Sequence, residues 1–266
     1  MQNKKTPLIS VIMNCHNGEK FLVKSLNSLL KQSYKNWELI FLDNFSDDKS
    51  KKIVSNFRDK RIKIFSTNKK VKLYHARNLA INKSKGKYIS FLDVDDAWKK
   101  NKLQSQINFL IRNKEFKLVY SNYYVLSEKK KLRYIKFKKN FDSGFVTQNL
   151  LNEYSIGILT ILIETKTMKK NLFNKKYNII GDFDCFIKLS LKNKIAYLKE
   201  PLAFYRIHDN NYSIKNLSEY IQELSYWIKN YKRLFVSFSF LNLHILLFKL
   251  KVKVILNIFF GRVVQW

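Results

Sequence analysis

The amino-acid sequence predicts an α/β protein, with a doubly wound, mainly parallel sheet flanked by helices and a helical C-terminal extension. Over the first hundred residues, short apolar runs rich in β-branched residues alternate with segments of helical spacing. Polar clusters follow the first, second and fourth runs, and from Leu217 onward the pattern is helical. Strands that alternate with helices are typical of a parallel sheet, whose ligands bind beyond the carboxyl ends of the strands.

The first half divides regularly into strands and helices. Strands are predicted at residues 8–13, 37–42, 62–65 and 88–92, and helices at 21–30, 46–57 and 76–82. Ser46, which two acidic residues follow, is the expected N-cap of the second helix. After Trp98 a helix should extend to about residue 113. Beyond it, apolar runs at 118–126 and 158–163 alternate less regularly with basic segments, which indicates mixed α/β structure.

The chain is strongly basic, with 51 Lys and Arg against 20 Asp and Glu and a formal net charge of +31. Such an excess suggests nucleic acid or an anionic membrane as a partner. The chain is also crowded with Lys, Asn and Ile, as a compositional drift over all surface positions would produce. No helix-turn-helix, zinc or RNA-binding signature is present, so we expect no nucleic-acid partner.

Length and cysteine usage limit the organisation further. A chain of 266 residues can form one large α/β domain, expected over residues 1–212, with a tail over residues 213–266. Cys15 and Cys185 have no metal-site spacing, and we expect both to be reduced thiols. The first residues show no cleavage pattern after their short apolar run, so the expected location is the cytoplasm.

Three carboxylates, Asp93, Asp95 and Asp96, stand within four residues directly after an apolar strand. Like charges repel at this distance, and a divalent cation would neutralise them. Mg²⁺ or Mn²⁺ typically binds one or two carboxylates together with phosphate oxygens of a substrate. The alternative is a solvated acidic turn that caps the next helix.

The surrounding segment, ARNLAINKSKGKYISFLDVDDAW, decides between these interpretations. It resembles the family-2 glycosyltransferases of GT-A fold, whose signature runs A-R-N, a small helix, G-x-Y, an apolar strand ending in F-L-D-x-D-D, and Trp. The family's opening is present as Pro7, Ser10, Val11 and Asn17, and its second element as ELIFLDNFSDD around Asp43. The resemblance covers residues 7 to about 110, with its motifs in the family's order.

The resemblance implies a nucleotide-sugar-binding half over residues 1–100 and an acceptor-binding half over residues 101–212. In the first half, Asn17 would belong to the donor site and Asp43 would accept a hydrogen bond from the nucleotide base. Arg77 would lie over the diphosphate, to which a guanidinium makes charge-assisted contacts. Asp93 would meet the ribose or the water shell of the metal, and Asp95 would bind a Mn²⁺ or Mg²⁺ ion bridging both phosphates.

Two further elements of the second half match the family. The segment IGDFDCFI resembles G-E-D-x-D, in which an aspartate removes the acceptor proton. Asp182 maps onto that base, but Gly181 stands in the place of the Glu, so Asp184 stays open as an alternative. The segment Tyr205-Arg206-Ile207-His208 resembles Y-R-x-H, whose histidine completes the metal coordination. This implies His208 as a metal ligand.

Two features differ from the family in their detail. Phe45 occupies the place of a glycine in the family's D-D-G-S turn. A bulky residue is costly at positive φ, so we expect this loop to have another shape. In the tail, apolar residues 234–248 are too short to span a membrane, and Lys249, Lys251 and Lys253 precede a second apolar stretch. This predicts an interfacial helix on an anionic membrane, or alternatively a helix packed on the catalytic domain.

The predicted function is therefore an inverting glycosyltransferase that moves a sugar from a nucleotide-diphosphate sugar to a glycan or lipid-linked acceptor, in bacterial surface polysaccharide synthesis. Asp182 would take the proton, and the metal at Asp95 would stabilise the leaving diphosphate. A metal-dependent nucleotidyltransferase and a non-enzymatic basic binding module are the alternatives. The first would release pyrophosphate, and the second has no use for the cluster at Asp93, Asp95 and Asp96.

Overall fold

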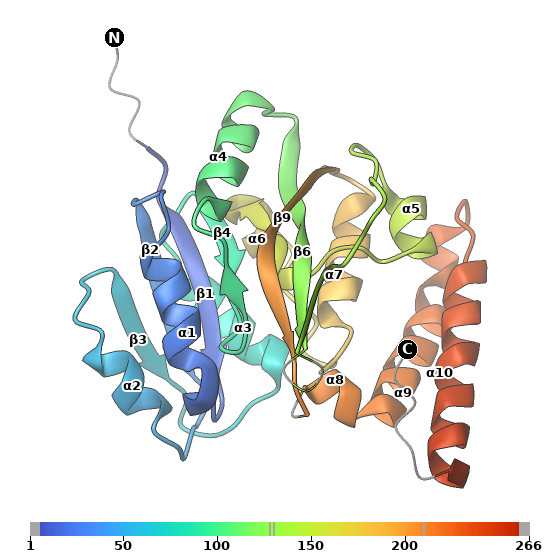
Figure 1. Ribbon diagram of the computed structural model, residues 1–266. Coiled ribbons are helices and arrows are strands. Elements are labelled where there is room, and N and C mark those ends of the chain that lie inside the picture. The colour runs from blue at the N-terminus through green and yellow to red at the C-terminus, as the bar shows by residue number, and fades with distance from the viewer. Residues whose placement is uncertain (1–5, 128, 130, 210, 261–266) are drawn as a thin grey trace.

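The computed structural model describes residues 6–127, 129, 131–209 and 211–260, which form one curved sheet covered by helices (Figure 1). The strands are β1 (Ile9–Cys15), β2 (Trp37–Asp43), β3 (Ile62–Ser66), β4 (Tyr88–Phe91), β5 (Ala97–Trp98), β6 (Phe116–Ser127), β7 (Leu132–Ile135), β8 (Leu162–Glu164) and β9 (Lys194–Ile207). The α-helices are α1 (Glu19–Leu30), α2 (Ser50–Asn56), α3 (Leu73–Lys83), α4 (Lys102–Arg112), α5 (Thr147–Asn152), α6 (Thr165–Lys170), α7 (Gly181–Ser190), α8 (Tyr212–Lys215), α9 (Leu217–Tyr231) and α10 (Leu241–Phe260). Two short 3-10 helices, Ile158–Thr160 and Lys232–Phe235, complete the elements.

The sheet has the strand order β3-β2-β1-β4-β8-β6-β9-β5, and β7 pairs with β6. Strands β3, β2, β1 and β4 are parallel, whereas β8 runs antiparallel to both of its neighbours, β4 and β6. The prediction of a doubly wound, mainly parallel α/β sheet is confirmed: β6 and β9 also pair in parallel, and β5, β7 and β8 are the described strands that run antiparallel to their neighbours. We call β3, β2, β1 and β4, which come from the first hundred residues, the parallel half of the sheet. The chain passes from β1 to β2 on one side and returns to β4 on the other, which leaves a crevice at the carboxyl ends of β1 and β4.

Two hydrophobic cores lie on the two faces of the sheet. Helices α1, α2 and α4 cover one face, and α3, α5, α6 and α7 cover the other. Strand β1 is buried along its whole length, with Ile12 facing one core and Val11 and Met13 the other. A strand that is buried on both faces has a continuous apolar sequence, and for this reason β1 could be predicted from the sequence.

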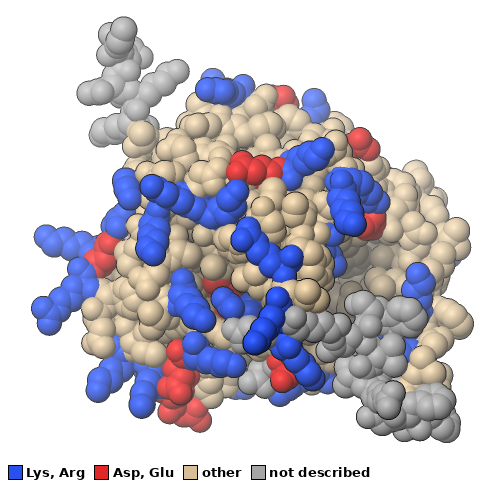
Figure 2. Space-filling model, in the orientation of Figure 1, with Lys and Arg blue, Asp and Glu red and all other residues tan. Residues whose placement is uncertain are grey.

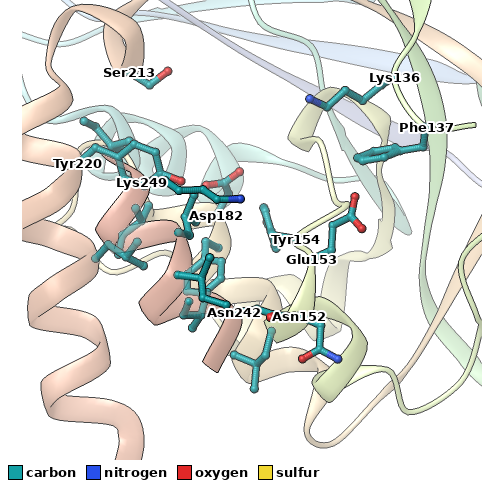
Figure 3. A pocket seen from close by; sticks show the side chains of 18 residues that line it. Lys136, Phe137, Asn152, Glu153, Tyr154, Asp182, Ser213, Tyr220, Asn242 and Lys249 are labelled. Carbon is teal, nitrogen blue, oxygen red and sulfur yellow. The ribbon is translucent and has the colours of Figure 1, made fainter. Parts of the chain in front are cut away.

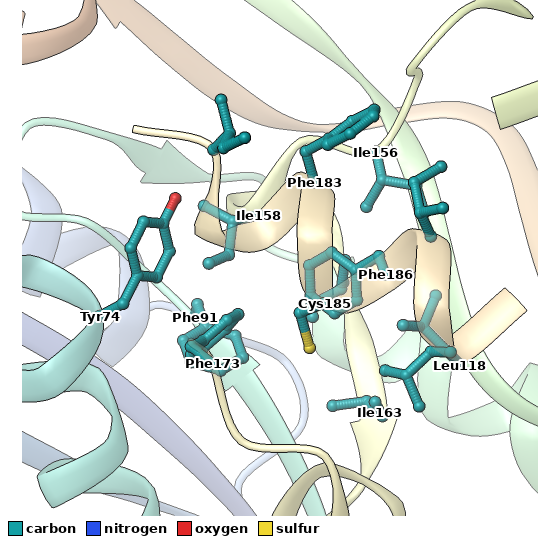
Figure 4. Packing of buried hydrophobic residues seen from close by; sticks show 14 of the residues in the cluster. Tyr74, Phe91, Leu118, Ile156, Ile158, Ile163, Phe173, Phe183, Cys185 and Phe186 are labelled. Atoms are coloured by element: carbon teal, nitrogen blue, oxygen red, sulfur yellow. The ribbon is translucent and has the colours of Figure 1, made fainter. Parts of the chain in front are cut away.

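Helix α7 lies at the centre of the core on the face that α3, α5, α6 and α7 cover (Figure 4). Its Phe186 packs edge-on to Phe173, which in turn contacts Phe91 of β4 and Tyr74 of α3. Aromatic rings bury large areas and prefer such tilted arrangements. These contacts fix α7, and with it the Asp182 segment, against the parallel half of the sheet.

The loop after β2 differs from the sequence prediction in two respects. Ser46 is not a helix N-cap: α2 begins at Ser50, whose backbone N–H donates to Asp48 Oδ1 at 2.9 Å. Phe45 adopts a positive φ of 63°. The expectation that phenylalanine would avoid a positive φ at this position is therefore wrong, because Phe45 has the left-handed conformation.

The C-terminal helices pack beside α5 and α7 at one end of the sheet (Figure 1). Trp227 of α9 is fully buried, and Leu243 of α10 lies 3% exposed in the same core. Within the described residues, no helix is long and apolar enough to cross a membrane. Lysine and arginine side chains are spread over the whole visible face, including the parallel half (Figure 2).

Candidate active site

The loops after β1 and β2 hold each other at the crevice. Asn17, at a φ of 56°, donates its backbone N–H to Ser46 Oγ at 3.1 Å and accepts from the backbone N–H of Asp47 through its side-chain oxygen. Asparagine tolerates this left-handed conformation better than most residues. The predicted donor residue Asn17 is thus engaged in shaping the donor loops, and its contact with the donor stays a prediction.

Asp43 ends β2 and is completely buried. Its Oδ2 accepts from the backbone N–H of Ser46 at 3.3 Å and lies 3.8 Å from Lys51 Nζ. Its Oδ1 has no hydrogen-bond partner among the described residues. A buried carboxylate oxygen without a partner is costly, so this atom is suited to accept an N–H from a bound ligand.

Arg77 of α3 is only 3% exposed and binds Asp93. One guanidinium nitrogen, Nη2, lies 2.8 Å from each carboxylate oxygen. The sequence had predicted an arginine over the diphosphate; the structure pairs it instead with the first aspartate of the cluster, and a phosphate contact stays a prediction. The ion pair fixes the orientation of Asp93 at the carboxyl end of β4.

Asp95 and His208, which are 113 residues apart, meet with Asp95 Oδ2 3.0 Å from His208 Nε2. Arg206 secures this contact, because its Nε donates to the Asp95 carbonyl and its backbone N–H donates to Asp96 Oδ1. Asn211 accepts the backbone N–H of His208 at 2.7 Å. The end of β9 is thereby attached to the carboxylate turn.

The donor atoms of Asp95 and His208 fit a Mg²⁺ or Mn²⁺ ion that takes its other ligands from phosphate oxygens and water. Among the described residues, no group of three or more His, Cys, Asp and Glu side chains gathers as a metal site. A two-residue protein site is consistent with a metal held jointly with its substrate rather than enclosed by protein.

Asp182 lies in the first turn of α7 and lines a cavity of about 650 Å³ (Figure 3). Burial raises the pKa of its carboxyl group, against the opposing effects of the Arg77 charge and of a hydrogen bond from Tyr74. The Tyr74 hydroxyl lies 2.9 Å from both Asp182 Oδ1 and the Ile179 carbonyl, so its single proton serves one acceptor at a time. A raised pKa makes a carboxylate a better proton acceptor.

Asp184, the alternative, is occupied elsewhere. It is 2% exposed, accepts from Trp227 Nε1 at 2.8 Å and pairs with Lys188 at 2.5 Å. The hydrogen bond from Trp227 attaches α9 to α7, and the ion pair with Lys188 lies within α7. The carboxylate of Asp184 therefore holds the C-terminal helices, whereas Asp182 faces the cavity.

Packing explains why Gly181 stands where the family's G-E-D-x-D motif has a glutamate. A Cβ at this position would lie 2.4–2.6 Å from three carbons of the Tyr74 ring, closer than any side chain allows. The ring of Tyr74 thus occupies the space of the missing side chain. Sequence reasoning missed Tyr74, although its place one turn before Arg77 in the Ala-Arg-Asn helix and the unexpected glycine were both available as signals.

The fold and the site define a glycosyltransferase of GT-A fold. The model of glycosyl transferase family 2 matches residues 10–186, and the chain belongs to this family. The predicted family, fold class and enzyme class are confirmed, which decides against the nucleotidyltransferase and the non-enzymatic binding module.

The chain is similar to several bacterial glycosyltransferases. It is 34% identical over 231 residues to an uncharacterized glycosyltransferase of Haemophilus influenzae, covering 85% of this chain and 90% of that one. It is 35% identical over 161 residues to the Escherichia coli UDP-Glc:alpha-D-GlcNAc-diphosphoundecaprenol beta-1,3-glucosyltransferase WfgD, covering 56% of this chain and 63% of the relative. The structure of S. aureus TarS 1-349 in complex with UDP-GlcNAc superimposes with a TM-score of 0.66 at 17% identity, over 83% of this chain and 66% of TarS 1-349.

Proposed function

We propose that this glycosyltransferase transfers a sugar, with inversion, from a nucleotide-diphosphate sugar to an acceptor hydroxyl, with Asp182 as the base and Asp95 and His208 as metal ligands. One observation carries the proposal. The cavity that Asp182 lines shares Ser213 and Tyr220 with a second cavity, of about 740 Å³, that His208 lines. The base Asp182 and the metal ligand His208 therefore line adjoining cavities, as the reaction of an acceptor hydroxyl with a metal-bound donor requires.

The donor would be held at the carboxyl ends of β1, β2 and β4. The unpartnered Oδ1 of Asp43 would accept an N–H of the base, and Asp93, fixed by Arg77, would meet the ribose. Asn17 would keep the two donor loops in place. A metal bound at Asp95 and His208 would offset the negative charge that develops on the departing diphosphate.

On the acceptor side, Asp182 would remove the proton of the attacking hydroxyl while the oxygen approaches the anomeric carbon from the face opposite the diphosphate. Its raised pKa suits this role, and Tyr74 would orient the carboxylate. A single displacement needs a single base and inverts the anomeric centre. The acceptor class is a glycan or lipid-linked glycan of bacterial surface polysaccharide synthesis, by analogy with the diphosphoundecaprenol-linked acceptor in the name of WfgD.

The tail would rest on an anionic membrane at the inner face of the plasma membrane. Leu241, Phe248 and Ile255 recur every seven residues along α10, and are 65%, 67% and 52% exposed. An unpartnered apolar stripe on a helix rich in lysine fits the interface of an anionic bilayer. Sedimentation with vesicles tests this: the double variant Leu241→Ser, Phe248→Ser should lose binding to phosphatidylglycerol vesicles. The control Leu132→Ser, Ile135→Ser on exposed β7 should retain it, and equal loss in both would contradict the membrane contact.

The first experiment is donor hydrolysis over a panel of nucleotide sugars, with Mn²⁺ or Mg²⁺ and with chelator, followed by release of nucleoside diphosphate. Metal-dependent release from one donor is the expected result. Release that is unaffected by chelator would remove Asp95 and His208 from the mechanism. No release and no nucleotide binding across the panel would contradict the proposed activity.

A further inference from the structure

The cavity beside Asp182 has two chemically different walls (Figure 3). Leu243 and Leu246 of α10 form an apolar side, together with Ile179 and Leu224. Lys249 reaches into the cavity from α10, and Lys136 enters from the opposite side, beyond β7. A purely sugar-binding site would need neither paired lysines nor an aliphatic wall.

The two lysines are available for a ligand. Both are exposed, and neither Lys136 nor Lys249 forms a salt bridge to a described acidic residue. Lys139, by contrast, is paired with Glu153, an acidic residue on the cavity rim. The positive charge that faces the cavity is therefore not balanced by the carboxylate beside it.

The position of Asp182 limits where an anionic group can lie. A carboxylate that is to accept a proton repels phosphate at close range, so an acceptor phosphate must stand off from Asp182 with the acceptor sugar in between. In Figure 3, Lys249 extends from α10 towards Asp182, and Lys136 lies on the opposite wall, farther from Asp182 in this view. The apolar residues of α10 continue beyond them to Leu250 and Val254, which line the neighbouring cavity.

We infer that this cavity binds an acceptor whose sugar is linked through a phosphate or diphosphate to a hydrocarbon chain, with Lys136 and Lys249 on the phosphate and Leu243 and Leu246 along the chain. The inference rests on the proposed function, because it assumes that Asp182 marks the acceptor pocket. One of the two lysines assigned to the anion, Lys249, lies outside the matched family segment, which ends at residue 186. Helix α10 would then be part of the substrate site and not only a packing element.

Binding of a short isoprenyl diphosphate tests the inference without requiring turnover. The protein is titrated with farnesyl diphosphate by calorimetry, with UDP, GDP and dTDP present to fill the donor site, and farnesol serves as the uncharged comparison. Lys249→Ala and Lys136→Ala should each weaken binding about tenfold, the value of one charge-assisted hydrogen bond. Lys229→Ala, which removes an exposed lysine of α9 outside both cavities, should leave binding unchanged.

A second pair of variants tests the apolar wall. Leu246→Ser should weaken farnesyl diphosphate binding about tenfold but leave binding of a glycerol-phosphate oligomer unchanged, whereas Ile111→Ser on the exposed side of α4 should affect neither. Equal binding of the oligomer and the isoprenyl diphosphate by wild type would overturn the lipid part. Equal affinity in the wild type and both lysine variants, or no binding at all, would overturn the site. Neither result would affect donor hydrolysis, on which the proposed function depends.

Discussion

The donor half and the acceptor half of the active site are built in different ways. The donor loops are held by contacts within the first hundred residues, as between Asn17 and Ser46 and between Arg77 and Asp93. The base of the acceptor half, and the metal pair between the two halves, depend on contacts between segments more than a hundred residues apart, Tyr74 with Asp182 and Asp95 with His208. The donor half is thus a local structure on parallel strands, and the base is placed only when both halves have folded together.

This difference predicts which properties a substitution in each half should change. A substitution within the donor loops should alter donor or metal binding and little else, because its partners are neighbours in the chain. A substitution at the junction of α3 and α7 should change stability and turnover together, because the same contacts carry both. Helices α9 and α10 extend the junction, since Trp227 binds Asp184 on α7.

The largest effect is expected at the base. Asp182→Asn should lower turnover about 10²–10⁴-fold, the usual range for loss of a general base, with nucleotide affinity unchanged. Asp184→Asn, two residues away, should reduce the free energy of unfolding by about 1–2 kcal/mol through its lost ion pair with Lys188, and change turnover far less. Steady-state kinetics and urea denaturation of both variants check this, and the opposite pattern would make Asp184 the base.

The metal pair comes next. Asp95→Asn and His208→Ala should each raise the Mn²⁺ concentration for half-maximal turnover about 10–100-fold. His244→Ala serves as the control, because this histidine is exposed on α10 and lies outside both cavities. If His208→Ala matched the control in a metal titration, its contact with Asp95 would be structural only.

The same comparison explains which parts could be predicted from the sequence. The parallel half was predictable because its strands are continuous apolar runs and its site residues stand directly after them. His208 was predictable only through the Y-R-x-H resemblance, since nothing local to β9 indicates that its end meets Asp95. Tyr74 and the cavity wall on α10 were missed, because both depend on packing between distant segments, for which the chain carries no periodic signal.

Gly181 is the point at which the junction can be tested directly. Gly181→Ala should displace the Tyr74 ring, and with it Asp182, at a cost of about 1–3 kcal/mol in unfolding free energy and about a tenfold loss of turnover. In the double variant Gly181→Ala, Tyr74→Ala the clash is absent. The loss of unfolding free energy in the double variant should therefore be smaller than the sum of the losses in the two single variants. Strict additivity in urea denaturation of wild type, the two single variants and the double variant would mean that the Tyr74 ring is not what excludes a side chain at position 181.

The pH dependence of turnover measures the Tyr74 contact more finely. Asp182 must be deprotonated to act, so turnover should fall as the pH drops through its raised pKa, at a higher pH than for an ordinary aspartate. The Tyr74 hydrogen bond lowers this pKa, so Tyr74→Phe should move the acidic limb to still higher pH, by about one unit or less. Tyr226→Phe, on the exposed side of α9, should leave the profile unchanged. A limb that stays in place in Tyr74→Phe would mean that the hydroxyl serves the Ile179 carbonyl instead.

The smallest effect is expected in the donor half, at Phe45. Its ring is 54% exposed and its φ is 63°, so the residue bears a conformational cost with little burial to offset it. Phe45→Gly should raise the free energy of unfolding by about 1 kcal/mol, whereas Phe45→Ala, which keeps a Cβ, should not. Because this loop is tied to Asn17 and not to α7, acceptor kinetics should be unchanged. A stability gain in the alanine variant as well would show that the exposed ring, rather than the backbone, is the source of the cost.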